Sequence, residues 1–125
     1  MNEIDAAWSA GLFDGKGSVR GGYMPTNIAI TSTDEDIVDN LIERTGMGRK
    51  YGPYERLNHP CQNGTSRKTQ WEWIVFGYEQ VEFLFQAWGE FLSGRRMEQF
   101  RRVLDTEQHI GLVVLEKNES GETDG

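Results

Sequence analysis

Residues 67–76, RKTQWEWIVF, place apolar and polar side chains on alternate positions, the pattern of a β-strand with one buried face. Trp71, Trp73 and Val75 fall on the same side of such a strand. A second stretch, residues 26–32, alternates in the same way. We therefore expect helices to cover one face of a sheet and the other face to stay open.

Helical patterns precede, separate and follow the strands, which predicts an α+β fold with an antiparallel sheet and the order α-β-β-α-β-β-α-α. The expected helices are residues 3–13, a helix that follows Ser32 and ends at Gly46, residues 79–92, and a last helix after Gly94; the expected strands are residues 17–23, 26–32, 49–57 and 67–76. At 125 residues we expect one domain, over residues 1–108, and an extension over residues 109–125 whose polar end is disordered.

The helix starts and helix faces also follow from the sequence. Asn2 suits the N-cap of the first helix, and STDE at residues 32–35 fits a capping box in which Ser32 accepts from the helix start and Glu35 reaches back. On the first helix, one face carries Ile4, Ala7, Trp8, Gly11 and Leu12. On the last two helices, the expected core stripes are Val81, Leu84, Trp88, Phe91 and Leu92, and then Met97, Phe100 and Leu104.

Composition excludes several classes of protein. An apolar run long enough to span a bilayer is missing from the sequence, and the amino terminus is acidic where a secretory signal would be basic, so we expect an intracellular, cytoplasmic protein. The single Cys61 cannot form an internal disulfide, and His59 and His109 are too few for a zinc site of the usual kind. We therefore expect no metal and no membrane partner from composition.

The net charge of −7 is unevenly distributed along the chain. Five acidic residues fall in the last 20, against one lysine. The predicted strand segments, residues 15–31 and 48–76, hold seven basic and two acidic residues, a net charge of +5. One electropositive face on an acidic protein is therefore possible, and such a face suits nucleic acid.

Three segments resemble the LAGLIDADG homing endonucleases. SAGLFDGKG at residues 9–17 is similar to the motif that gives the family its name, and ITSTDEDIVDNLIERTGMGRKY at residues 30–51 resembles the strand, helix and turn that follow it. EFLSGRRMEQF at residues 90–100 is similar to the region near the last helix. With the matching order of elements, the resemblance covers roughly residues 4–106.

The resemblance implies a homodimer on double-stranded DNA. In the family the motif helix packs against its counterpart in a second copy, and small residues allow the close approach; Ala7, Ala10 and Gly11 match that role. An isologous dimer would place two sheets as a saddle over a pseudo-palindromic site. Tight packing inside a monomer is the alternative explanation of these small residues.

The resemblance also identifies a departure at the place of catalysis. The family motif ends in an acid that binds a divalent cation, and here that position is Lys16, which has no lone pair for Mg²⁺. Asp14 lies two residues earlier, where we expect a helix-end hydrogen bond. Ser32 aligns with a polar family residue near the active-site water, and the family's basic residue falls on Arg95 or Arg96. We expect no cofactor unless cleavage, and with it Mg²⁺, is retained.

Long polar side chains on the predicted strands are the candidates for base contacts. They are Arg20, Asn27, Arg49, Lys50, Arg67, Lys68 and Gln70. The leading interpretation is a homodimeric DNA-binding protein impaired in cleavage. Two alternatives stay open: an active endonuclease that holds metal through Asp14 or another residue, and a scaffold that binds a protein, such as an inhibitor module of a phage or mobile element.

Overall fold

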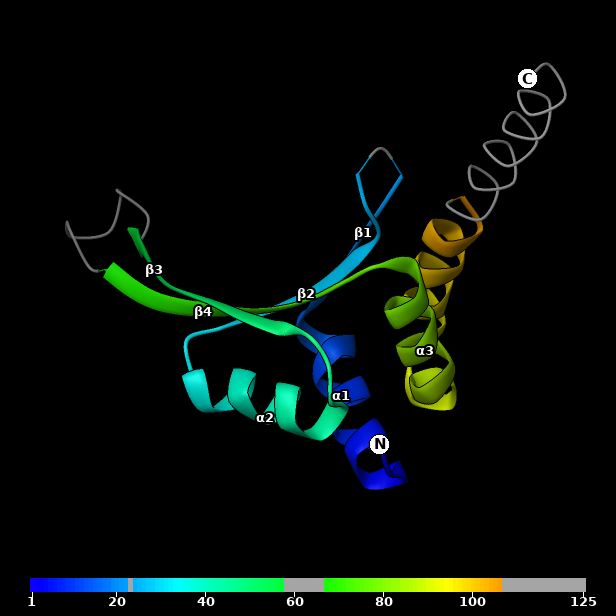
Figure 1. Cartoon of the computed structure of the whole chain (residues 1–125), viewed down its shortest axis with the longest axis horizontal. Coiled ribbons are helices and arrows are strands. Elements are labelled where there is room, and N and C mark those ends of the chain that lie inside the picture. The colour runs from blue at the N-terminus through cyan, green and yellow to red at the C-terminus, as the bar shows by residue number, and fades with distance from the viewer. Residues whose placement is uncertain (23, 58–66, 107–125) are drawn as a thin grey trace, which may run out of the picture.

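The computed structural model describes residues 1–22, 24–57 and 67–106, which form an open sheet with helices below it and beside one end (Figure 1). The elements are α1 (Glu3–Lys16), β1 (Gly17–Arg20), β2 (Asn27–Ser32), α2 (Glu35–Thr45), β3 (Arg49–Leu57), β4 (Arg67–Phe76), α3 (Tyr78–Trp88), a 3-10 turn η1 (Gly89–Phe91) and a last helix described over residues 94–106. The α+β prediction is confirmed. The expected extension at residues 109–125 and the loop with Cys61 lie outside the described residues.

The four strands form one antiparallel sheet in the order β1-β2-β4-β3. The strands β3 and β4 have the predicted bounds. The hairpin of β1 and β2 is shorter than predicted, because Gly21 and the positive φ of Gly22 (87°) end β1 early. A side chain at Gly21 would meet Val103, so the last helix lies against the end of this hairpin.

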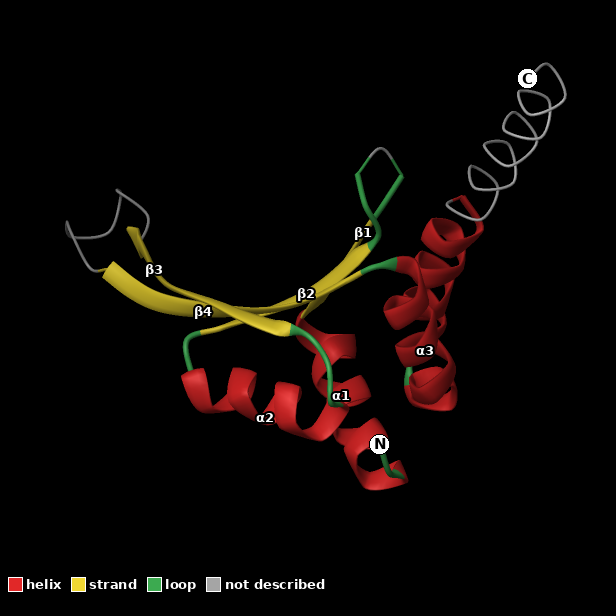
Figure 2. Ribbon diagram, viewed as in Figure 1, coloured by secondary structure: helices red, strands yellow, loops and turns green. Residues whose placement is uncertain are grey.

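The sheet buries one face against the helices, as Figure 2 shows for α1 and α2. Ile28 and Ile30 of β2 and Trp73 and Val75 of β4 are fully buried in the core, and Trp71 packs against it. These are the residues that the period-two pattern places together. The opposite face is not covered by a described helix.

The helix α1 continues three residues beyond its predicted end, and its buried face differs from the predicted stripe. The buried residues are Ala6, Ser9, Ala10 and Phe13. Two contacts with Trp88 of α3 turn this face of α1 inward. Trp88 Nε1 donates to Ser9 Oγ at 2.8 Å, and the centre of the Phe13 ring lies 5.0 Å from that of Trp88. Periodicity alone favoured the wrong face because Ser9 counts as polar.

The start of α2 also differs from the prediction. Its N-cap is Asp34, whose side chain accepts from the Asp36 amide at 3.0 Å. In the turn before the helix, Ser32 Oγ accepts from the Asp34 amide. Ser32 is therefore a turn residue before the cap, because the helix starts two residues later than expected. The helix ends at Gly46 in the left-handed conformation, as predicted.

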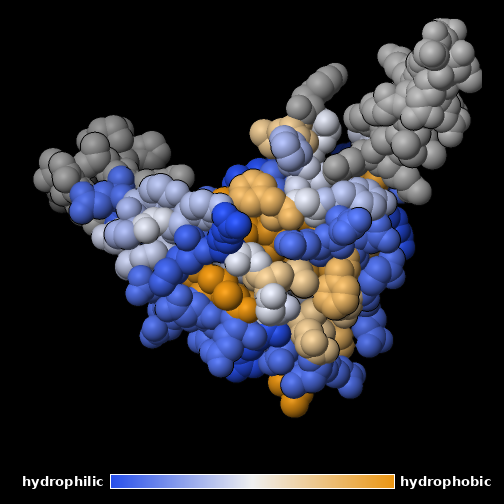
Figure 3. All heavy atoms as spheres, viewed as in Figure 1, coloured by the Kyte–Doolittle hydropathy of each residue, from blue (hydrophilic) through white to orange (hydrophobic). Residues whose placement is uncertain are grey.

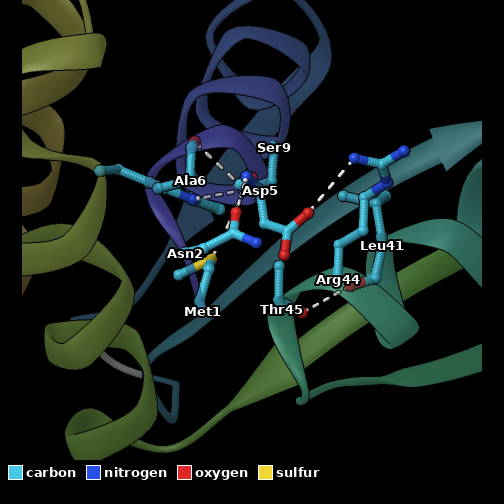
Figure 4. Close-up of polar contacts among 9 residues, drawn as sticks. Met1, Asn2, Asp5, Ala6, Ser9, Leu41, Arg44 and Thr45 are labelled. Carbon is cyan, nitrogen blue, oxygen red and sulfur yellow. Dashed lines mark hydrogen bonds and ion pairs between the residues drawn. The ribbon is translucent and has the colours of Figure 1, made fainter.

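Polar contacts join α1 to α2 (Figure 4). The Asp5 amide donates to Oδ1 of the N-cap residue Asn2 at 2.7 Å, and the Asp5 carboxylate accepts from Arg44 Nη1 at 3.2 Å. The Arg44 guanidinium also lies 4.8 Å from the centre of the Trp8 ring. These contacts hold the two helices together below the sheet.

The last two helices pack through their predicted core residues, but α3 ends at Trp88 and not at residue 92, because Gly89–Phe91 form the 3-10 turn η1. Val81, Leu84 and Trp88 of α3 are fully buried, and Phe100 of the last helix stacks on Phe85 with ring centres 5.1 Å apart. Within the described part of the chain, no helix is long and apolar enough to cross a membrane.

Candidate nucleic-acid interface

The face of the sheet that the helices leave open carries polar, cationic and aromatic side chains from all four strands. Strand register places them in rows, such as Arg20, Asn27 and Phe76 in one row and Thr31, Glu72 and Tyr51 in the next. We call this surface the open face. Its described side chains are Ser18, Arg20, Asn27, Ala29, Thr31, Arg49, Tyr51, Tyr54, Lys68, Gln70, Glu72, Ile74 and Phe76.

Cations stand near the ends and the edge of the open face. Arg20, Arg49 and Lys68 are all exposed. Arg49 pairs in register with Ile74, and Lys68 lies toward the outer end of the β3–β4 ribbon. This spread suits a long polyanion better than a single bound anion. Arg67 begins β4, but its side chain lies outside what the structure describes.

Lys50 lies on the other side of the sheet from these cations. Its Nζ is 2.9 Å from Asp39 Oδ1 and 3.5 Å from Glu35 Oε2, both on α2. The hydrogen bond with Asp39 raises the pKa of the Lys50 ammonium, and the charges of Asp39 and Glu35 add to this. Strand parity places Lys50 opposite Trp73, so among the sequence candidates it does not belong to the open face.

Aromatic and amide groups fill much of the open face between the cations. Tyr54 and Phe76 are 46% and 49% exposed, and Tyr51 meets the Phe76 ring edge-on at 6.4 Å. Asn27 Oδ1 and Gln70 Oε1 are buried and lack a hydrogen-bond partner among the described residues. Sequence reasoning listed Asn27 and Gln70 but missed the aromatic residues, although their strand positions carried the signal.

Glu72 lies near the middle of the open face and was not among the sequence candidates. Its Oε2 is 3.5 Å from Arg20 Nη2 and accepts from Thr31 Oγ1 at 3.4 Å. A hollow of about 260 Å³ is lined by Thr31, Tyr54, Glu55, Gln70 and Glu72. The alternation with Trp71 and Trp73 could have placed Glu72 on this face.

A second hollow, of about 460 Å³, opens at the β3 edge of the sheet. It is lined by Gly46, Met47, Gly48, Arg49, Ile74, Phe76 and Gln80. In the same orientation as Figure 1, Figure 3 shows hydrophilic residues gathered over α2 and a more apolar strip between α2 and α3. The open face therefore continues into this hollow through Arg49, Ile74 and Phe76.

The end of α1 presents Lys16 to solvent. Its cationic side chain suits the last turn, because the helix dipole is negative there. No ion pair of Lys16 occurs within the described ranges. The site that the resemblance reserves for an acid thus holds an exposed ammonium.

Asp14 is engaged by the start of the last helix. Its Oδ1 accepts from the Ser93 amide at 2.8 Å. The backbone and side-chain hydrogen bonds of Ser93 lower the pKa of the Asp14 carboxyl, and the charges of Arg96 and Arg95 add to this effect. Asp14 therefore makes a helix-end contact of the kind expected of it.

Arg95 and Arg96 differ in what they can reach. Arg96 is only 8% exposed: its Nε donates to Asp14 O, its Nη1 donates to Gln99 Oε1, and its guanidinium lies over the Phe13 ring. Arg95 is exposed. Of the two sequence candidates, Arg95 is the one positioned for an external anion.

The donor set at the end of α1 does not fit Mg²⁺. This cation needs several oxygen ligands, and Lys16 supplies none. One oxygen of Asp14 is already bonded to Ser93. No group of three His, Cys, Asp or Glu that could hold a metal occurs in the described part of the chain.

The outward face of α1 carries small residues. Gly11 and Gly15 are exposed, a Cβ atom at either would meet nothing within 4 Å, and Ala7 is half-buried. Ala10 is fully buried in the core of the chain. Of the predicted interface residues, Ala10 therefore has no exposed surface to offer a second copy, whereas Ala7 and Gly11 lie on the outer face with Gly15 one turn further; the interface itself stays a prediction.

Comparisons with solved structures find this fold among homing endonucleases. I-CvuI in complex with its target aligns with a TM-score of 0.60 and 16% identity, over 82% of this chain and 65% of that chain. The archaeal intron-encoded I-Vdi141I complexed with DNA gives 0.56 and 13%, over 82% of this chain and 68% of that chain. I-TnaI gives 0.56 and 17%, over 83% and 74%.

At these identities the likeness shows a shared fold. The chain spans just under two thirds of the I-CvuI chain. No protein-family model matches the sequence, and no curated protein matches it.

Proposed function

We propose that this protein belongs to the LAGLIDADG homing-endonuclease family and binds double-stranded DNA as a homodimer without efficient metal-dependent cleavage. The observation that supports this most is the open face: a four-stranded sheet, uncovered by described helices, that presents Arg20, Arg49 and Lys68 on a chain of net charge −7. Exposed cations on one face of an acidic protein can attract a polyanion, and the phosphate backbone of DNA is such a polyanion.

The outward face of α1 supports the proposed dimer. Ala7, Gly11 and Gly15 are spaced four residues apart and so lie along one line of the helix. With no side chain at two of these three positions, a second α1 can approach backbone to backbone. Symmetric pairing along this line would join two open faces into one surface and double the number of phosphate contacts.

The chemistry at the end of α1 supports the proposed impairment of cleavage. An ammonium at Lys16 can attract phosphate but cannot hold a metal. The active-endonuclease alternative would require Asp14 or another residue to supply metal ligands, and Asp14 Oδ1 already accepts a hydrogen bond from the Ser93 amide. Binding and cutting would therefore be separated in this chain.

The test is to incubate purified protein with a pool of random duplexes at low salt, with and without Mg²⁺. We expect retained duplex that stays intact, and we expect Lys16→Glu to gain Mg²⁺-dependent nicking or cleavage on the selected duplexes. Cleavage by the unchanged protein would establish the active alternative. Absence of any duplex binding at low salt would overturn the proposal and favour a protein partner.

A further inference from the structure

Glu72 is an acidic side chain on the surface that we propose binds the phosphates of DNA. It lies in β4, one of the two inner strands of the sheet, with its side chain 19% exposed on the open face. A carboxylate near the DNA backbone repels phosphate and weakens binding. Its presence there requires either a structural role or a partner that donates hydrogen bonds.

The two oxygens of Glu72 have different surroundings. Oε2 receives Thr31 Oγ1 and the Arg20 guanidinium, from the neighbouring strand β2 and the edge strand β1. Oε1 has no hydrogen-bond partner among the described residues. The carboxylate is thus held from one side and offers a free acceptor on the other, beside the 260 Å³ hollow.

A fixed acceptor discriminates between base edges in the major groove. Cytosine presents an N4 amino donor there, and a carboxylate is the side chain that accepts from it, whereas guanine presents the acceptors O6 and N7 and would be repelled. Gln70 lies two residues away on the same face, about 6.6 Å along the strand, and could contact a neighbouring base pair. The hollow leaves room for a base edge beside Glu72.

We propose that Glu72 is a specificity-determining residue that accepts a hydrogen bond from a cytosine N4 amino group, with Thr31 and Arg20 holding its carboxylate in place. This inference rests on the proposed function. In a symmetric dimer it predicts the same preference at two positions equally distant from the centre of the site.

A purely structural role would be to orient Arg20, so the variants must separate the two. In Glu72→Gln the shape is kept and the acceptor-only character is lost, since an amide also donates and pairs with adenine. Arg20→Ala removes the cation but keeps the carboxylate. Thr31→Val removes only the hydroxyl donor and keeps the charge of Glu72.

The experiment selects bound sequences from a duplex library randomised across both half-sites, for the unchanged protein and the three variants, after thermal unfolding has shown each variant to be folded. We expect a cytosine preference at one position per half-site. Glu72→Gln should lower it about tenfold and raise adenine there, leaving other positions unchanged. Thr31→Val should weaken the same cytosine preference with little change in average affinity for DNA. If Glu72→Gln does not fold, Thr31→Val still tests the inference.

Three results would overturn the inference. One is a base preference that is unchanged in Glu72→Gln. Another is a change at that position that Arg20→Ala reproduces in full, because Glu72 would then act only through Arg20. The third is DNA binding with no cytosine preference anywhere. If the unchanged protein binds no duplex at low salt, the proposed function itself fails, and this inference fails with it.

Discussion

Trp88 and Ser9 fix the rotation of α1 about its own axis. The indole Nε1 of Trp88 donates to Ser9 Oγ at 2.8 Å, and Ser9 Oγ in turn donates to the Asp5 carbonyl at 2.6 Å. This contact turns Ser9 and Ala10 into the protomer. It leaves Gly11 facing outward, where the proposed interface lies.

Neighbouring substitutions on α1 should therefore have opposite effects. Gly11→Leu should leave the folded chain as stable as before, or more stable by about 0.5–1 kcal/mol, because leucine favours a helix and nothing lies within 4 Å of a Cβ at this exposed position. The same change should convert a dimer into a monomer, since bulk at this point separates two packed helices. Sedimentation equilibrium and urea unfolding measure the two effects.

Ala10→Leu is the matched control for that variant. Ala10 is fully buried, so the larger side chain should overpack the core and cost about 2 kcal/mol or more of unfolding free energy. A Gly11→Leu protein with the same solution mass as the unchanged dimer would contradict an interface on α1.

Asp14 should contribute to stability in a pH-dependent way. Its pKa is lowered in the folded protein, so its contribution is fully present above the ordinary carboxyl pKa and is lost as the pH falls through the lowered value. Asp14→Ala should cost about 1 kcal/mol at pH 7, and the difference from the unchanged protein should shrink in acid. Urea unfolding at a series of pH values measures this, and Asp14→Asn, which keeps an acceptor without the charge, should show a smaller loss. A loss from Asp14→Ala that is the same at pH 3 and pH 7 would contradict it.

Gly48 should tolerate substitution less well than Gly46, although both have positive φ (94° and 72°). A side chain at Gly46 meets open space, so Gly46→Ala should cost about 1 kcal/mol for backbone strain alone. A side chain at Gly48 runs into the buried indole of Trp73, whose Nε1 donates to Met47 O, so Gly48→Ala should cost about 3 kcal/mol. Equal losses of unfolding free energy in the two variants would contradict the close approach of Trp73.

The sequence was most informative where one physical signal dominates. The core positions of Trp73 and Val75 follow from alternation along β4, and the end of α2 follows from Gly46. The buried face of α1 could not be predicted, because Ser9 enters the core through a hydrogen bond to a residue 79 positions away. No local pattern reports such a partner.

The candidate site was predicted in part, for a similar reason. Residue type identified Arg20, Asn27, Lys68 and Gln70, all of which lie on the open face. Lys50 is a cation like its neighbour Arg49, but successive residues of a strand point to opposite faces of the sheet. The Lys50 side chain therefore faces Asp39 and Glu35 on α2. Glu72 was passed over because acids were counted only against DNA binding.

The salt dependence of duplex binding tests the central claim most directly, that the open face binds DNA. The logarithm of the binding constant should fall linearly with the logarithm of salt concentration, and Lys68→Ala should reduce that slope by about 0.9 for each copy bound. Lys50→Ala should leave the slope unchanged, since Lys50 is paired on the opposite face. No binding of duplex at low salt, or equal slopes for all three proteins, would contradict the account.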